Sequence, residues 1–110
     1  MSLDYSWQKL HLATLGLATG NEPVQKRLAG AFINMHTLKA EDFPEGPLRD
    51  KFMAIEVKVE AAMAIVSANP QKGEIAASIE AMSDSDADQM IREIMSLYDQ
   101  VCRRMGKEGF

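Results

Sequence analysis

The sequence predicts an all-α fold, a compact helical bundle of four main helices plus one short helix, with residues 1–110 forming a single domain. Three observations lead to this prediction. Apolar side chains recur at gaps of three and four residues, which places them on one side of an α-helix. No run of residues alternates between apolar and polar for long enough to indicate a strand. Short connections separate the helical segments, so neighbouring helices are expected to run antiparallel.

The first two helices are expected over residues 4–19 and 22–38. Gly20 suits the left-handed conformation that commonly follows a helix. Asn21 is then expected to cap the second helix, and Pro23 is tolerated in its first turn. The side of the second helix that is expected to be buried carries Val24, Leu28, Ala31, Phe32, Met35 and Leu38.

A polar connection follows, in which Phe43 is expected to close the end of the core. The third helix should begin near Glu45 or Pro47, since proline is accepted at the first helical position. It should end by residue 68, because an Asn-Pro pair and then a glycine interrupt the pattern. Arg49 is expected on or beside the exposed side of this helix. The buried side carries Leu48, Phe52, Ile55, Val59, Met63 and Val66.

A short fourth helix is expected over residues 73–82, followed by the last and most strongly specified helix. Ser83 is expected to cap this last helix, and Asp84 in its first turn favours the exposed backbone N–H groups. Arg103 and Arg104 lie near its other end, where positive charge is favourable. Its apolar stripe consists of Ala87, Ile91, Ile94, Tyr98, Val101 and Met105.

The composition indicates a soluble globular protein and disfavours several function classes. Hydrophobic residues make up 46% and charged residues 25% of the 110 residues, which is too apolar for a disordered chain. The net charge of −4 is spread along the chain, which disfavours nucleic acid as a partner. No apolar stretch is long enough for a membrane span, and no secretion signal is visible. The single cysteine excludes an internal disulfide, so a cytoplasmic location is expected.

Residues suited to catalysis or metal binding are few and scattered. Neither His11 nor His36 follows a glutamate by three residues, which is the spacing common in metal sites of helical bundles. The acidic run at residues 84–88 lacks the glycine and the glutamate of a calcium-binding loop. Cys102 lies beside Val101 in a helical stripe, where cysteine usually has a packing role. We therefore predict no catalytic residue, no metal and no cofactor.

Apolar residues are more numerous than the principal stripes require. Contiguous exposed apolar surface usually marks an interaction site. We therefore predict a non-enzymatic protein-interaction or regulatory module, either a homodimer or a binder of another protein, with Met90 and Leu97 on the contact surface. The alternative is that these residues simply fill a broad core. The additional apolar residues are Leu12, Leu15, Ile33, Met53, Val57, Ile65, Met90 and Leu97.

Two other functions remain open from the sequence. The first is a nuclease-like or other small enzyme with a site near His36 and the turn at residues 41–45. Nucleases of the HEPN class are helical bundles with an arginine and a histidine, but these lie closer together than Arg27 and His36. The second is a nucleic-acid-associated regulator. The polar residues of the enzyme hypothesis are Arg27, His36, Glu41 and Asp42.

Two stretches in the first half of the chain carry a further pattern. Residues 23–32 read PVQKRLAGAF, and residues 41–52 read EDFPEGPLRDKF. The order P-x-Q-x-R-L-x-x-A-aromatic, E-D-F-P-E and L-R-x-x-F resembles a group of small uncharacterised bacterial proteins without an established activity. The resemblance implies a bacterial or phage origin and a helical fold, and nothing catalytic. Gly46 departs from the usual turn of that group.

Overall fold

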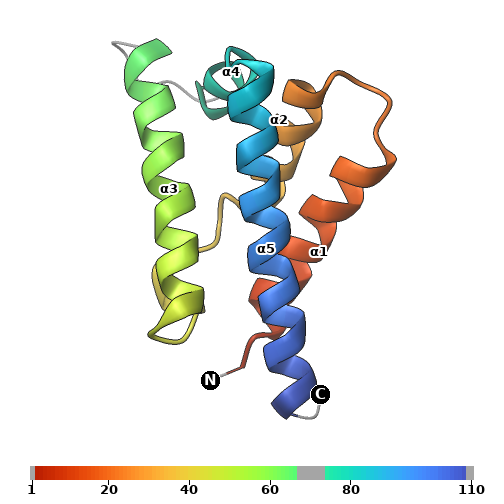
Figure 1. The fold of residues 1–110 in the computed structure, drawn as a ribbon, viewed down its shortest axis with the longest axis vertical. Coiled ribbons are helices and arrows are strands. Elements are labelled where there is room, and N and C mark those ends of the chain that lie inside the picture. Colours follow the sequence, from red (N-terminus) through yellow and green to blue (C-terminus); the bar gives the residue numbers. More distant parts are fainter. Residues whose placement is uncertain (1, 67–73, 109–110) are drawn as a thin grey trace.

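The computed structural model describes residues 2–66 and 74–108 and confirms the all-α prediction. The described residues form five α-helices and one 3-10 turn, and they contain no strand. Their bundle measures 43 × 29 × 23 Å (Figure 1). None of the described helices is both long enough and apolar enough to cross a membrane. The elements are α1 (Asp4–Thr19), α2 (Val24–Met35), η1 (Ala40–Asp42), α3 (Pro47–Val66), α4 (Glu74–Glu80) and α5 (Asp84–Glu108).

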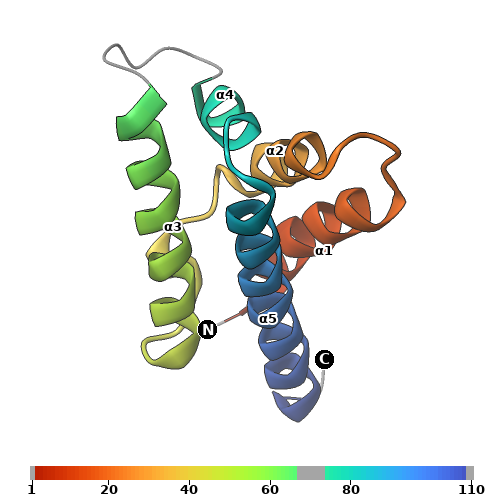
Figure 2. The same ribbon diagram turned by 45° about the horizontal axis from the view of Figure 1, so that its top comes forward.

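Helix α5 runs along the length of the bundle and contacts α1, α2 and α3. Helix α1 crosses α5 obliquely in the opposite general direction, so that it starts toward the end of the molecule where α5 ends, and its second half diverges from α5 (Figure 1). Helix α3 lies on the other side of α5, while α2 packs against α1 and α4 (Figure 2). As a result, α5 forms one junction with α1 and a second junction with α3.

The first helix occupies the predicted residues, but the glycine after it has a different role from the predicted one. Gly20 adopts an extended conformation with φ −73° and ψ 149°, so the expected left-handed turn is wrong. A Cβ atom at Gly20 would lie 2.9 Å from both Cγ and Cδ of Arg27. The position therefore lacks room for a side chain. Asn21 does not cap α2, whose N-cap position is Pro23 and which has no side-chain cap.

Helix α2 ends at Met35, earlier than the predicted residue 38. The chain turns there through a hydrogen bond from the Leu38 N–H to the Met35 carbonyl, with an N–O distance of 2.9 Å. The 3-10 turn η1 follows and was not predicted. Its Asp42 carboxylate accepts the Lys39 backbone N–H at 2.7 Å, which stabilises the turn locally.

Helix α3 begins at Pro47, as predicted, directly after a turn that requires glycine. Gly46 has a φ of 118°, a conformation that side chains with a Cβ rarely adopt. The predicted end of this helix at residue 68 and the Asn-Pro pair after it lie outside the described residues. The short fourth helix is confirmed over Glu74–Glu80, within the expected range.

The core combines buried residues from all the helices and from the turn before α3. Phe43 closes its end as predicted, because it is fully buried and its ring stacks on Phe52 with centroids 4.7 Å apart. Each of the five helices contributes a core residue that is less than 2% exposed: Leu10, Leu28, Ile55, Ile79 and Ile94.

Helix α5 has the predicted cap and a broader buried side than predicted. The Ser83 hydroxyl accepts the Asp86 backbone N–H at 3.1 Å, which confirms the cap. Met90 is 2% exposed and Leu97 is 0% exposed. The prediction that these two residues form a contact surface is therefore wrong: at these positions the alternative of a broad core holds. The reason is that α5 contacts helices on more than one side.

Candidate functional site

Arg27, a residue of the predicted polar site, is used to join α1 to α2. Its Nε donates to the Glu22 carbonyl at 2.9 Å, and its Nη1 donates to the Leu17 carbonyl at 2.7 Å. The guanidinium thus satisfies a carbonyl at the end of α1 that has no partner within the helix. This role occupies the side chain at the N-terminal end of α2, away from the turn at residues 41–45.

The other three residues of that hypothesis do not form a site with Arg27. His36 follows the last residue of α2 and is exposed, with Nδ1 2.6 Å from the Ile33 carbonyl. Nine residues of helical rise separate its Cα from that of Arg27 by about 14 Å. Glu41 is exposed, and the Asp42 carboxylate is used within η1. The polar arrangement needed for the enzyme hypothesis is therefore not assembled.

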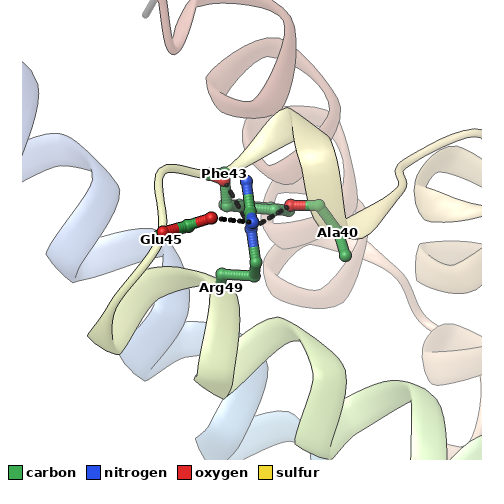
Figure 3. Close-up of polar contacts among 4 residues, drawn as sticks. All are labelled: Ala40, Phe43, Glu45 and Arg49. Atoms are coloured by element: carbon green, nitrogen blue, oxygen red, sulfur yellow. Dashed lines mark hydrogen bonds and ion pairs between the residues drawn. The ribbon is translucent and has the colours of Figure 1, made fainter.

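Arg49, and not Arg27, contacts the turn at residues 40–45. Its Nε donates to the carbonyls of Ala40 and Phe43 at 3.1 and 3.0 Å, and its Nη1 lies 3.5 Å from Glu45 Oε1. Figure 3 shows the guanidinium between the two carbonyls and the glutamate. The sequence signal that would have found this contact is the position of Arg49 in the first turn of α3, within reach of the preceding loop.

A second polar contact fixes the same turn to the first helix. Ser6 is 1% exposed, and its hydroxyl donates to the Asp42 carbonyl at 2.6 Å. The Tyr5 hydroxyl lies 2.6 Å from the Thr37 hydroxyl nearby. These contacts join α1 to the turn and to the residues that follow α2.

The junction of α1 and α5 gathers aromatic and titratable side chains that are distant in sequence. The Trp7 and His11 rings stack, with centroids 4.8 Å apart and planes inclined by 11°. His11 Nδ1 lies 3.0 Å from the Tyr98 hydroxyl, and the two rings are tilted by 42°. All three side chains are partly exposed. His11 and Tyr98 lie 87 residues apart in the sequence, and only the packing of α1 on α5 brings them together.

The titration of Tyr98 reflects this environment. Partial burial first, and then the neighbouring Cys102 side chain, raise the pKa of Tyr98 above its ordinary value of 10.0. The phenol therefore stays protonated at neutral pH and acts as a hydrogen-bonding group. In the ranges that the structure describes, no three His, Cys, Asp or Glu side chains are placed to hold a metal ion.

Three exposed apolar residues extend this junction toward the solvent. Leu12, Leu15 and Met95 are 40%, 49% and 44% exposed. Leu15 follows His11 by about one turn, and Met95 precedes Tyr98 by about one turn. Leu15 and Met95 therefore each lie about one turn from the residues through which α1 contacts α5. We define the α1–α5 face as Trp7, His11, Leu12, Leu15, Met95 and Tyr98.

Four charged residues of α5 border the α1–α5 face. Arg92 Nε lies 2.9 Å from Asp88 Oδ2, and Arg103 Nε lies 2.9 Å from Asp99 Oδ2. The two pairs are 11 residues apart, about three helical turns, so they share a side of the helix with Met95 between them. Pairs of this kind on the surface contribute little to stability. They are relevant here because acidic and basic side chains alternate along this side of α5, in the order Asp88, Arg92, Asp99 and Arg103.

Helix α3 carries a second exposed apolar pair. Met53 is 46% exposed and Val57 is 62% exposed, one turn apart. Asp50, Glu56 and Glu60 lie within one turn of this pair, whereas Arg49, one turn before Met53, is held against the Ala40 and Phe43 carbonyls. Partial burial first, and then the charges of Glu60 and Glu41, raise the pKa of Glu56. The face of α3 therefore has an acidic border, whereas the border on α5 alternates in sign.

Searches with protein-family models, of curated proteins and of solved structures find no match to this chain. The resemblance to small bacterial helical proteins therefore stays a prediction.

Proposed function

We propose that this chain is a non-enzymatic protein-interaction module that forms a homodimer through the α1–α5 face. The observation that carries the proposal is the exposure of Leu12, Leu15 and Met95 beside a partly exposed cluster of aromatic rings. The proposal extends to a bacterial cytoplasmic setting, which the single cysteine and the sequence resemblance support. No specific observation favours the enzyme or the nucleic-acid alternative.

The residue types of the α1–α5 face suit a protein contact. Tryptophan and tyrosine are enriched among the residues that dominate binding energy, and methionine is enriched at interfaces. Trp7 and Tyr98 are already held in place by His11, so little of their side-chain freedom remains to be lost on binding. Burial of Leu15 and Met95 would add a favourable term of roughly 25 cal/mol per Å² of apolar surface.

The charges of α5 favour a second copy of the chain as the partner. An antiparallel contact between two α5 helices, with its two-fold axis beside Met95, places Asp88 opposite Arg103 of the second copy. The same axis places Arg92 opposite Asp99, because both pairs are centred on the same point of the helix. A two-fold interface repeats each contact. The alternating border of the α1–α5 face is therefore complementary to itself.

The exposed pair on α3 is less suited to such a contact. A two-fold pairing through Met53 and Val57 would bring the acidic residues around them close to their copies. Like charges in close contact across an interface oppose association. This difference provides a matched control on the same molecule.

The first test introduces a charge at each of the two apolar surfaces. Leu15→Glu is expected to convert the dimer to a monomer, because it buries a carboxylate in the contact. Val57→Glu, at a residue that is even more exposed, is expected to leave the dimer intact. Sedimentation velocity gives the mass of each variant, and circular dichroism checks the helical content. Equal effects of the two substitutions would contradict the proposal.

The second test reverses charges at the border. Arg92→Asp or Asp99→Arg alone is expected to weaken dimerisation by about tenfold or more, because each places like charges opposite one another twice. The double variant restores opposite charges between copies and is expected to recover the dimer. A double variant that is weaker than both single variants would exclude this arrangement.

A further inference from the structure

A groove of about 430 Å³ lies where α3, α4 and α5 meet. Its walls carry small side chains that cannot fill the space between three helices: Ala61 and Ala62 from α3, Ser78 from α4, and Ala81 from the turn after α4. Met82 and Met90 add two flexible apolar side chains to the lining. The groove lies at the junction of α5 with α3 and is independent of the α1–α5 face.

One polar atom of the groove has no partner. Ser78 is 1% exposed, and its Oγ makes no hydrogen bond. A buried hydroxyl without a partner is unfavourable, and most such groups in proteins are paired. Ser78 lines the groove, so rotation about its χ1 angle allows the hydroxyl to meet a group that enters the space. A hydroxyl both donates and accepts, so it can pair with a hydroxyl or an N–H group.

The charges around the groove indicate a neutral occupant. Lys58 lies at the lining, and its ammonium group contacts the Glu93 carboxylate. Asp86 lies at the lining in the first turn of α5, where the helix N-terminus stabilises its negative charge. Each charge is thus compensated within the protein. An ionic ligand would have to break one of these contacts, whereas a neutral ligand would not.

We infer that this groove binds a small neutral aromatic molecule with one hydroxyl or N–H group, such as a phenol or an indole. The alanines leave room for a flat ring, and Met82 and Met90 provide sulfur atoms that make favourable contacts with aromatic rings. The Ser78 hydroxyl pairs with the polar group of the ligand. The volume falls within the range of small-molecule sites, about 300–1,000 Å³.

The test compares phenol with toluene, which has nearly the same shape but no hydroxyl. Each is titrated into the full chain, and the amide chemical shifts are followed by NMR. Phenol is expected to shift the amides of Ala62, Ser78 and Met90 to saturation, and to bind about fivefold to tenfold more tightly than toluene. Absence of saturable shifts at millimolar phenol, or shifts centred elsewhere, would overturn the inference.

Two variants locate the site and the hydroxyl contact. Ala62→Leu fills the groove and is expected to abolish phenol binding, whereas Ala54→Leu, on the same helix but outside the groove, leaves it unchanged. Ser78→Ala is expected to remove the preference for phenol over toluene while toluene still binds. An unchanged preference in Ser78→Ala would show that the hydroxyl is not recognised there. Circular dichroism confirms that each variant is folded.

Discussion

At the scale of single residues, two apolar side chains of α5 that look alike in the sequence differ widely in their exposure. Leu97 and Met95 are two residues apart on α5, yet Leu97 is 0% exposed and Met95 is 44% exposed. The period of the apolar stripe predicts the centre of the buried side. It does not predict the width of that side, which depends on how many helices contact α5.

Substitutions at Leu97 and Met95 are expected to lower the free energy of unfolding by different amounts. Leu97→Ala should lower the free energy of unfolding by about 2–5 kcal/mol, because it leaves a cavity in the core. Met95→Ala should change it by about 0.5 kcal/mol or less in the monomeric Leu15→Glu background, since the side chain is exposed there. Urea unfolding measures both. Similar values for the two variants would contradict the assigned burial.

Gly20 and Arg27 depend on each other, although they belong to different elements. Gly20→Ala is expected to be destabilising by about 1 kcal/mol, because its Cβ would displace the Arg27 side chain from two carbonyls. In an Arg27→Ala background the same substitution should be neutral or stabilising, since alanine reduces the entropy of the unfolded chain. A double-mutant cycle measured by thermal unfolding gives the coupling. Additive effects would rule out the contact.

At the scale of elements, the periodic segments were predictable and the connections were not. The bounds of α1, the start of α3 and the Ser83 cap follow from local patterns, and the structure confirms them. The turn η1 contains a hydrogen bond from the Lys39 N–H to the Asp42 carboxylate, and it contacts Ser6, which is 36 residues away in the sequence. No periodic pattern encodes such contacts.

Arg49 is expected to be the most sensitive charged residue of the turn. Arg49→Lys keeps the charge but loses the Nε donor that reaches the Ala40 and Phe43 carbonyls (Figure 3). We expect a loss of about 1–2 kcal/mol in the free energy of unfolding. Glu45→Gln should cost under about 0.5 kcal/mol, because that side chain is 88% exposed. Equal losses in the two variants would show that the ion pair, and not the carbonyl contacts, holds the turn.

At the scale of the whole molecule, the candidate site was only partly predictable. Exposure of Leu12 and Leu15 agrees with the expectation of surplus apolar residues, whereas the predicted contact at Met90 and Leu97 is wrong. The meeting of His11 with Tyr98 joins residues 87 positions apart. Such a meeting follows from the packing of helices, which local patterns do not specify.

The acidic surface of α3 is expected to make stability depend on pH. The pKa of Glu56 is raised in the folded state above its ordinary value of 4.5. Its contribution to stability is therefore fully present below the unfolded pKa and is lost as the pH rises through the folded pKa. Glu56→Gln should be more stable than the parent chain at pH 7, by roughly 0.2–0.5 kcal/mol.

Urea unfolding at several pH values measures this difference. It should disappear below about pH 4, where Glu56 is protonated in both states. Glu80→Gln, on exposed α4 surface, serves as the control. A Glu56→Gln variant that is less stable than the parent chain at pH 7 would show that ionised Glu56 is favourable in the fold.

The mass of the unmodified chain in solution tests the central claim most directly. The chain has a mass of 12.2 kDa, and self-association through the α1–α5 face predicts a species of twice that mass in sedimentation equilibrium. The fraction of this species should rise with protein concentration and fall in the Leu15→Glu variant. A mass of 12.2 kDa at every concentration up to the millimolar range would contradict the account.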